Sequence, residues 1–189
     1  RLRERLKGDV KFVFQPAEEG PGGARPMIAA GVMENPTVDY VIGCHLWAER
    51  PEGCIGVRPG PFMAAMDRFD LTIRGRGGHA AQPHLCVDAV EVGAQVVAAL
   101  QRLVSRKLDP TEPAVVTVST FHAGTAFNIL PSEAVLSGTT RAFSEAIWAS
   151  WEERIRRVVQ GVCESMGAGF ELQYTQGYPP TINDARMAE

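Results

Sequence analysis

The N-terminal part of the sequence contains two short, mostly hydrophobic runs, at residues 10–14 and 39–46. Runs of this length are typical of strands that are buried on both faces, as in a parallel sheet. Polar groups lie where these predicted strands end: Glu18 and Glu19 follow the first run, and His45 closes the second. The carboxyl ends of parallel strands share one edge of an open sheet. If the two strands are neighbours, we therefore expect Glu19 and His45 to converge on one crevice.

The hydrophobic pattern changes after a stretch rich in Gly and Pro at residues 53–61. Phe69, Leu71 and Ile73 alternate with polar residues, which predicts a half-buried strand. The following segments predict, in order, a helix at 87–105, strands at 114–120 and 133–141, a helix at 145–166 and a strand at 170–174. This β-α-β-β-α-β order is the ferredoxin-like, split βαβ arrangement.

Apolar positions about one turn apart predict which face of each helix is buried. In the first helix these positions are Val90, Ala94, Val97 and Leu100 or Gln101. In the second helix they are Ile147, Trp151, Ile155, Val158, Val162 and Met166.

Together these patterns predict an α/β fold class in which a small α+β module is inserted after an α/β piece. We expect residues 1–64 to form part of a first, α/β domain, residues 65–176 to form the module, and residues 177–189 to lead back to the first domain. Residues 24–33 predict a short helix, and residues 1–7 read as the end of a charged helix. Because the sequence opens inside that helix and lacks an initial Met, we expect it to be a piece of a longer protein.

The composition is that of an ordinary globular chain, with 45% hydrophobic and 22% charged residues. The net charge of -3 and the lack of a dense basic run argue against a nucleic-acid partner. No stretch has the length and apolarity of a membrane span or a signal peptide, so we expect a cytoplasmic protein without a membrane partner. The cysteines show no C-x-x-C spacing, which favours free thiols over a zinc or disulfide framework.

The adjacent carboxylates Glu18 and Glu19 suit metal-assisted hydrolysis, because neighbouring side chains diverge. One can ligate a metal while the other takes the proton of a water molecule. A carboxylate with the imidazole of His45 suits zinc, manganese or cobalt better than calcium. The alternatives are a solvated Glu pair in a surface loop and a hydrogen-bonded structural histidine.

Five motifs occur in an order that resembles a known family: F-Q-P-A-E-E-G-P-G-G-A, G-C-H-L-W, G-R-G-G-H-A-A-Q-P-H, F-N-I-L-P and S-G-T-T-R-A-F. They are similar to the motifs of the dinuclear metal-dependent amidohydrolases and peptidases. That family includes hippurate hydrolase, N-acyl-amino-acid amidohydrolases and indoleacetic-acid–amino-acid hydrolases. The resemblance implies that residues 1–64 are part of a metallopeptidase-like catalytic, metal-binding domain and that residues 65–176 are a ferredoxin-like lid and dimerisation domain. It also implies hydrolysis of the amide bond of N-acyl amino acids with two divalent metal ions per site (zinc, manganese, cobalt or nickel).

The resemblance also implies roles for individual residues. Glu18 matches the general base, and Glu19 and His45 match metal ligands. His79 matches a lid histidine that reaches into the active site of a partner subunit and polarises the substrate carbonyl. Asn128 and Arg141 match lid residues that hold the substrate. Arg141 would bind the free carboxylate of the substrate through two parallel hydrogen bonds that Lys could not form.

Simpler interpretations remain open for the lid residues: His79 as the cap of a Gly-rich turn, Asn128 as a turn residue, and Arg141 as a surface charge. The family also supplies metal ligands from an upstream Cys-Gly-His-Asp type segment and a histidine near the C-terminus, and neither lies within residues 1–189. With two plausible ligands, the sequence alone predicts weak metal binding and no hydrolysis by this chain by itself. A second hypothesis is therefore a non-catalytic dimerisation or binding module.

The predicted strand at residues 114–120 is β-rich and carries few charges. As an edge strand of the lid it would invite pairing with a second copy of itself. We therefore expect a homodimer formed through the lid, which a role of His79 in the partner's site would require.

Overall fold

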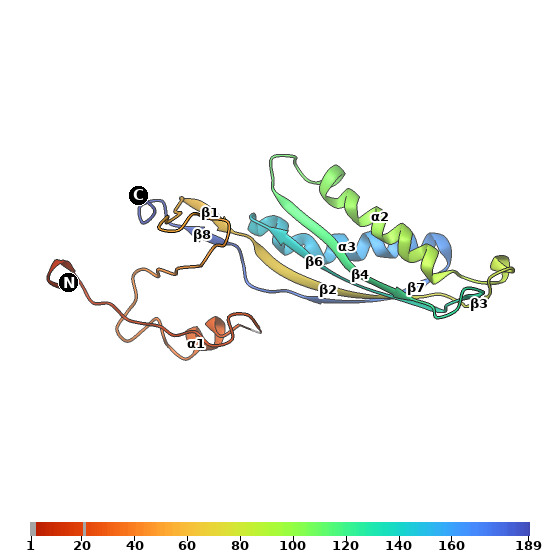
Figure 1. The fold of residues 1–189 in the computed structure, drawn as a ribbon, viewed down its shortest axis with the longest axis horizontal. Helices are drawn as coiled ribbons and strands as arrows, with labels where there is room; N and C mark the ends of the chain where they lie inside the picture. Colours follow the sequence, from red (N-terminus) through yellow and green to blue (C-terminus); the bar gives the residue numbers. More distant parts are fainter. Residues whose placement is uncertain (1–2, 21) are drawn as a thin grey trace. The chain divides into compact units, whose positions relative to one another are not determined.

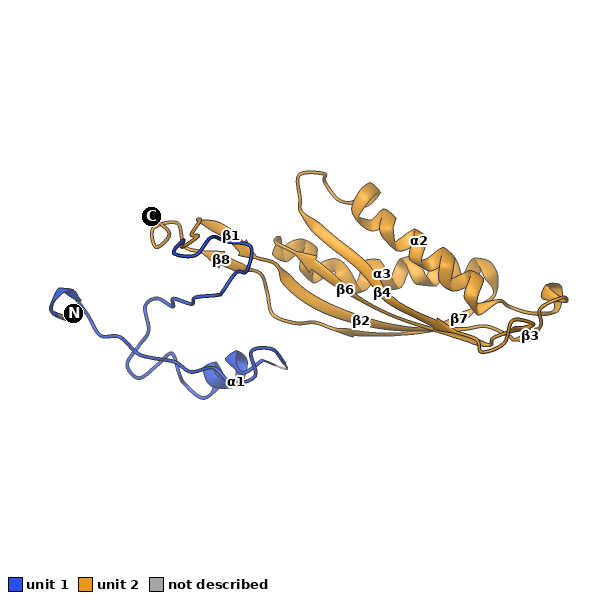
Figure 2. Cartoon of the chain, viewed as in Figure 1, with its two compact units in different colours: residues 1–54 blue, residues 55–189 orange. Residues whose placement is uncertain are grey.

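A computed structural model describes residues 3–20 and 22–189, which form two compact units. Unit 1 is Arg1–Cys54 and unit 2 is Ile55–Glu189 (Figure 2). Part of the helix end expected at residues 1–7, and Pro21 of the Gly-rich turn, lie outside the described residues. Of the described remainder, Arg3–Arg5 form a 3-10 turn, η1, and Leu6 and Lys7 belong to no helix.

Unit 1 contains the short helix α1 (Ala24–Ala29), shorter than the predicted 24–33. The predictions of buried strands at residues 10–14 and 39–46 are wrong: neither segment forms a strand, and neither belongs to a sheet among the described residues. Their side chains are exposed, for example Phe14 at 86% and Ile42 at 81%. A buried strand needs neighbouring strands for its backbone groups and covering layers for its side chains. No described segment of this chain supplies either.

Unit 2 contains the predicted β-α-β-β-α-β module (Figure 1). Its elements are β2 (Ala65–Arg74), α2 (Ala89–Lys107), β4 (Ala114–Ala123), β6 (Glu133–Ala142), α3 (Glu145–Met166) and β7 (Gly169–Thr175). The strands form one antiparallel sheet in the order β4-β6-β2-β7, which is the ferredoxin-like topology. The predicted edge strand is therefore an edge strand, β4.

The helices α2 and α3 cover one face of this sheet (Figure 1). Asp88 and Ser144 cap their N-termini through side-chain oxygens, and Gly167 ends α3 in the left-handed conformation (φ 70°). The core between helices and sheet is built from alternate strand residues and one stripe of each helix. It includes Phe69, Leu71, Ile73, Val92, Val96, Leu100, Leu136, Trp151, Ile155 and Val159.

The buried stripe of each helix departs in part from the prediction. In α2, Val90 is 40% exposed and Ala94 is exposed, while Val92 and Val96 are buried. The helix is rich in small apolar residues on several sides, so periodicity alone could not fix its orientation. In α3 the stripe holds through Ile155 and then moves one position to Val159 and Cys163.

Two small sheets flank the module. β1 (Gly60–Met63) pairs with β8 (Thr181–Asn183), and β3 (Gly78–His79) pairs with β5 (Ile129–Leu130). The first is an antiparallel ribbon formed by the segments that precede β2 and follow β7. The predicted division of the chain at residues 64 and 177 remains a prediction. None of the helices described has the length and apolarity to cross a membrane.

The carboxylate of Asp67 is the buried polar centre of unit 2, in a residue that is 2% exposed. It accepts hydrogen bonds from Trp148 Nε1 at 2.8 Å, Tyr174 Oη at 2.5 Å and the backbone N–H of Gly177 at 2.8 Å. A Cβ on Gly177 would lie 2.0 Å from the carbonyl oxygen of Met66, so only glycine permits this close crossing. The carboxylate thus joins β2, α3, β7 and the segment that leaves the module.

Replacing Tyr174 by Phe should lower the free energy of unfolding by about 1–3 kcal/mol, because Asp67 Oδ2 would lose its donor inside the protein. Urea unfolding followed by tryptophan fluorescence measures this change. Tyr40→Phe, at a tyrosine that is 53% exposed, is the matched control and should have no effect. Equal stability of Tyr174→Phe and the wild type would contradict the assigned role of the bond.

The stabilisation from the hydrogen bond between Tyr174 and Asp67 should depend on pH. Burial, and then the hydrogen bond to Asp67, raise the pKa of Tyr174 above its ordinary value. Folding therefore favours the protonated phenol. Its contribution is complete below pH ~10 and is lost as the pH rises toward the raised pKa. The difference between wild type and Tyr174→Phe should accordingly shrink above that pH.

Candidate active site

Glu18 and Glu19 lie on an exposed turn of unit 1. The carbonyl oxygen of Ala17 accepts the N–H groups of Gly20 at 3.2 Å and Gly22 at 3.0 Å, which closes the turn. Ala17 has φ 54°, a left-handed conformation that costs a residue with a Cβ of order 1 kcal/mol. Both carboxylates are therefore presented to solvent by a tight turn that begins at a strained residue.

His45 is exposed, and its ring is oriented by contacts with the next two residues, Leu46 and Trp47. Its Nδ1 lies 2.5 Å from the carbonyl oxygen of Leu46, and its ring centroid lies 5.5 Å from that of Trp47. A carbonyl oxygen can only accept, so Nδ1 carries the proton of the neutral ring. Nε2 then keeps its lone pair, as a metal ligand requires.

Glu19 and His45 fit a divalent transition metal in kind, since they offer carboxylate and imidazole donors. Two donors are fewer than the three or four protein ligands of a stable metal site. No group of three or more His, Cys, Asp or Glu side chains that could hold a metal ion occurs among the residues that the structure describes. The described part of the chain thus contributes donors but not a full coordination sphere.

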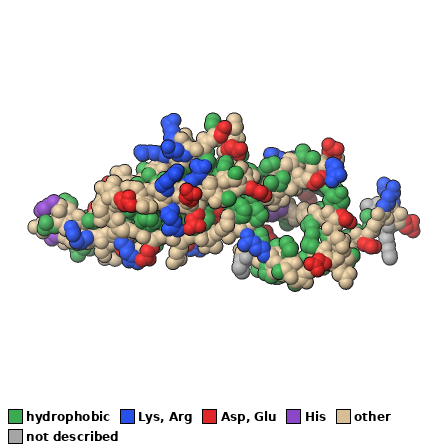
Figure 3. All heavy atoms as spheres, turned by 180° about the vertical axis from the view of Figure 1, so that it is seen from behind, with side chains coloured by type: hydrophobic (Ala, Val, Ile, Leu, Met, Phe, Trp, Pro, Cys, Tyr) green, Lys and Arg blue, Asp and Glu red, His purple; other side chains and the backbone are tan. Residues whose placement is uncertain are grey.

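His79 and Asn128 are brought together by the small sheet of β3 and β5. His79 pairs with Ile129, and the N–H of Ala80 donates to the carbonyl oxygen of Asn128 at 3.0 Å. Histidine side chains gather at one end of unit 2 (Figure 3), where β3 is followed by η2 (Pro83–Leu85). Two motifs separated by about fifty residues in the sequence therefore meet at this end.

The ring of His79 has the opposite proton arrangement to that of His45. The backbone N–H of Ala81 donates to His79 Nδ1 at 3.1 Å. An amide N–H can only donate, so Nδ1 is the acceptor and the proton of the neutral ring sits on Nε2. The exposed Nε2–H is a hydrogen-bond donor, as needed to polarise a carbonyl oxygen.

Arg141 lies at the other end of the sheet from His79. Arg74 pairs with Glu133 at one end of the β2–β6 ladder and Ala65 with Ala142 at the other, while β3 and β5 lie beyond the Arg74 end (Figure 1). At about 3.3 Å per residue, Glu133 and Arg141 are about 25 Å apart along β6. The structure therefore brings His79 and Asn128 together but does not bring Arg141 to them within one chain.

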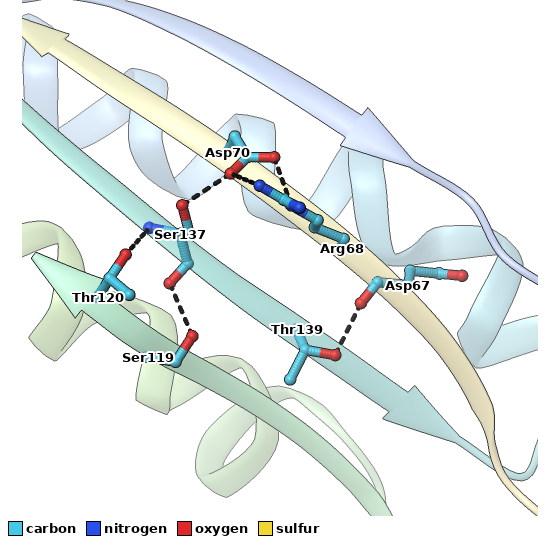
Figure 4. Close-up of polar contacts among 7 residues, drawn as sticks. All are labelled: Asp67, Arg68, Asp70, Ser119, Thr120, Ser137 and Thr139. Atoms are coloured by element: carbon cyan, nitrogen blue, oxygen red, sulfur yellow. Dashed lines mark hydrogen bonds and ion pairs between the residues drawn. The ribbon is translucent and has the colours of Figure 1, made fainter. Parts of the chain in front are cut away.

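The face of the sheet opposite the helices, here called the open face, carries a network of polar side chains (Figure 4). Arg68 donates to Asp70 at 2.8 Å through Nε and at 2.9 Å through Nη2, and Ser137 Oγ donates to the same carboxylate at 2.7 Å. The Arg68 guanidinium lowers the pKa of Asp70. Arg74 pairs with Glu133 at 2.7 Å and Glu171 at 3.0 Å.

Arg141 lies on the open face without such a carboxylate. Its Nη1 donates to Thr139 Oγ1 at 2.8 Å and to the carbonyl oxygen of Thr140 at 3.2 Å, and no ion pair joins it to any described acidic residue. The sequence did not single out Thr139. The available signal was its place two residues before Arg141 in a strand, which puts both side chains on one face.

Comparison with known proteins places these residues in a family. The model of peptidase family M20/M25/M40 matches residues 1–189. The chain belongs to this family. Its ferredoxin-like module is the lid of the M20 fold, as the resemblance predicted.

Two curated relatives are similar to this M20 chain over almost all of its length. The N-acyl-L-amino acid amidohydrolase of Geobacillus stearothermophilus is 48% identical over 97% of the chain and 49% of its own length. The N-acetylcysteine deacetylase of Bacillus subtilis is 39% identical over 96% of the chain and 47% of its own. The chain thus spans about half the length of the curated relatives it matches.

A solved structure supports the same assignment. The Bacillus subtilis protein YxeP, a dinuclear metal-binding peptidase of the M20 family, matches with a TM-score of 0.76 and 34% identity. The match covers 99% of this chain and 47% of that protein. Dinuclear metal binding is therefore a property of a structural relative. The roles of Glu18, Glu19, His45, His79, Asn128 and Arg141 remain predictions.

The donor count predicts weak metal binding by residues 1–189 alone. After dialysis against zinc or manganese, elemental analysis should find well below one ion per chain, because Glu19 and His45 are only two of the three or four ligands of a stable site. One ion per chain, lost in Glu19→Ala and kept in the control Glu34→Ala, would contradict this prediction.

Proposed function

We propose that the complete protein is a metal-dependent amidohydrolase that cleaves the amide bond of N-acyl amino acids. Family membership and the names of the similar proteins support this proposal. The structural observation that carries it is the complementary state of two histidines. His45 presents a bare Nε2 suited to a metal, and His79 presents an Nε2–H suited to a substrate oxygen.

Glu18 acts as the general base in this proposal. Glu19 and His45 would hold part of a divalent metal site, and the bound metal would supply Lewis-acid activation of a water molecule. Glu18, on the same exposed turn as Glu19, takes the proton from the attacking water. It then passes the proton to the amine that leaves when the amide bond breaks.

His79 and Asn128 act on the substrate carbonyl. The Nε2–H of His79 donates a hydrogen bond to the carbonyl oxygen, whose negative charge grows as the water attacks. The Ala81 N–H fixes the proton on Nε2, so the donor is in place before the substrate binds. Asn128, held beside His79 by the β3–β5 pairing, adds a neutral amide to the same end of the lid.

Arg141 binds the free carboxylate of the N-acyl amino acid. It is half-buried and positively charged, and unlike Arg68 and Arg74 it has no carboxylate partner among the described residues. A guanidinium binds a carboxylate with two parallel hydrogen bonds, which gives both affinity and orientation.

We further propose a homodimer formed through the lid. β4 is an exposed edge strand, with Val115 at 46% and Phe121 at 37% exposure. The distance between His79 and Arg141 along one lid is too long for both to hold a single amino-acid substrate. A two-fold dimer resolves this by letting His79 of one chain serve the site that contains Arg141 of the other.

The metal is zinc, manganese, cobalt or nickel in this proposal, and the protein is cytoplasmic.

A second candidate function is a dimerisation or binding module without catalysis. It is favoured by one observation: unit 2 has a complete core of its own, whereas the described metal donors form no site.

The complete reading frame that encodes this chain should hydrolyse N-acetyl and N-benzoyl amino acids. A chelator should abolish the activity, and zinc, manganese or cobalt should restore it. Glu18→Gln should lower kcat about 10²–10⁴-fold, because it removes general-base catalysis, and should leave the metal content unchanged.

The matched control is Glu34→Gln, at an exposed carboxylate of the same unit, which should keep full activity. Amine release is followed with a ninhydrin-type reagent. Hydrolysis that survives chelation, or a Glu18→Gln variant with wild-type kcat, would contradict the proposed function.

A further inference from the structure

Three arginines project from the open face of the lid sheet, and they differ in what holds them. Arg68 and Arg74 are each neutralised by carboxylates from their own or neighbouring strands. Among the residues that the structure describes, Arg141 is bound by neutral oxygens alone, from Thr139 and Thr140. The lid therefore orients this guanidinium without neutralising it.

The hydroxyl of Thr139 has a fixed direction. Its single proton is donated to the carbonyl oxygen of Asp67 at 2.8 Å (Figure 4), so toward Arg141 the hydroxyl oxygen can only accept. Nη1 of Arg141 occupies that acceptor site at 2.8 Å. The order Arg141 to Thr139 to Asp67 is thus a directional chain of two hydrogen bonds.

The carbonyl oxygen of Asp67, which accepts the second of these hydrogen bonds, belongs to a rigid part of the lid. Asp67 lies in β2, one of the two inner strands, and its carboxylate is buried and bound by three donors from α3, β7 and the segment after β7. A backbone carbonyl in such a strand is a rigid reference point. Through its two hydrogen bonds, Thr139 restricts the side chain of Arg141, which would otherwise sample many rotamers.

We propose that Thr139 is a positioning residue for substrate binding, in that it fixes the rotation of the Arg141 guanidinium for a carboxylate. The inference rests on the proposed function. With Nη1 held, Nε and Nη2 of Arg141 have no hydrogen bond to any described residue, and they form the fork that a carboxylate accepts. Without the Thr139 hydroxyl, each binding event must first order the arginine.

The test is Thr139→Val in the complete protein, which keeps the shape and removes the hydroxyl. The KM for an N-acyl amino acid should rise about tenfold, the effect of one hydrogen bond to a charged group, with kcat nearly unchanged. The Ki of the corresponding carboxamide as a competitive inhibitor should not change, because it lacks the anion. Thr139→Ser should restore the wild-type KM, and the control Thr72→Val, on the same face, should have no effect.

A double-mutant cycle excludes a merely structural role. In an Arg141→Ala background, Thr139→Val should cause no further rise in KM. If Thr139→Val lowers the yield of folded protein, Thr139→Ala serves in the same cycle.

Unchanged KM in Thr139→Val would overturn this inference alone. Equal effects on the carboxamide, or an undiminished effect without Arg141, would also overturn it. If the wild type hydrolyses no N-acyl amino acid, the proposed function fails and the inference fails with it.

Discussion

The buried carboxylate of Asp67 is the contact on which the arrangement of the lid depends. It binds an indole, a phenol and a backbone amide from three different segments, and none of them carries a charge. A buried carboxylate is stable only when such donors surround it, so loss of the Tyr174 hydroxyl would leave one of its oxygens, Oδ2, without a donor from the protein. The backbone carbonyl of Asp67, through Thr139, also orients Arg141, the arginine of the open face that has no carboxylate partner among the described residues.

The antiparallel register of β2 and β6 places the β3–β5 pair, with His79 and Asn128, at one end of the sheet and Arg141 at the other. A rigid sheet cannot close this distance by bending. In the homodimer that we propose, opposite ends of two lids would meet in one active site. The exposed edge strand β4 would be the surface through which the two sheets pair.

The parts of the fold set by local pattern could be predicted from the sequence. The order of strands and helices in the lid follows from alternation and periodicity, and Ser144 and Gly167 mark the helix α3 by capping chemistry alone. The runs at residues 10–14 and 39–46 have strand composition, but strands form only with hydrogen-bonding partners, and the described chain offers none. The orientation of α2 was also missed, because its small apolar residues occur on more than one side.

The site residues divide in the same way. His79, Asn128 and Arg141 stand in motifs, so their identity could be predicted from the sequence. The bonds that set their chemistry could not. The position of the proton in His79 depends on the Ala81 N–H. The orientation of Arg141 depends on Thr139, whose hydroxyl donates to the carbonyl oxygen of Asp67 in a strand distant in sequence. Asp67 carried one unused signal, because the alternation of Phe69, Leu71 and Ile73 already placed it on the buried face.

The central claim is that His79 completes the active site of a partner chain. Subunit complementation tests it directly: inactive Glu18→Gln and His79→Ala proteins are mixed, exchanged by mild denaturation and refolding, and assayed. Half of the dimers formed at random are mixed, and each contains one site with both intact residues. About a quarter of the wild-type activity should therefore return. If no activity returns although mixed dimers are present, His79 serves its own chain and the account is wrong.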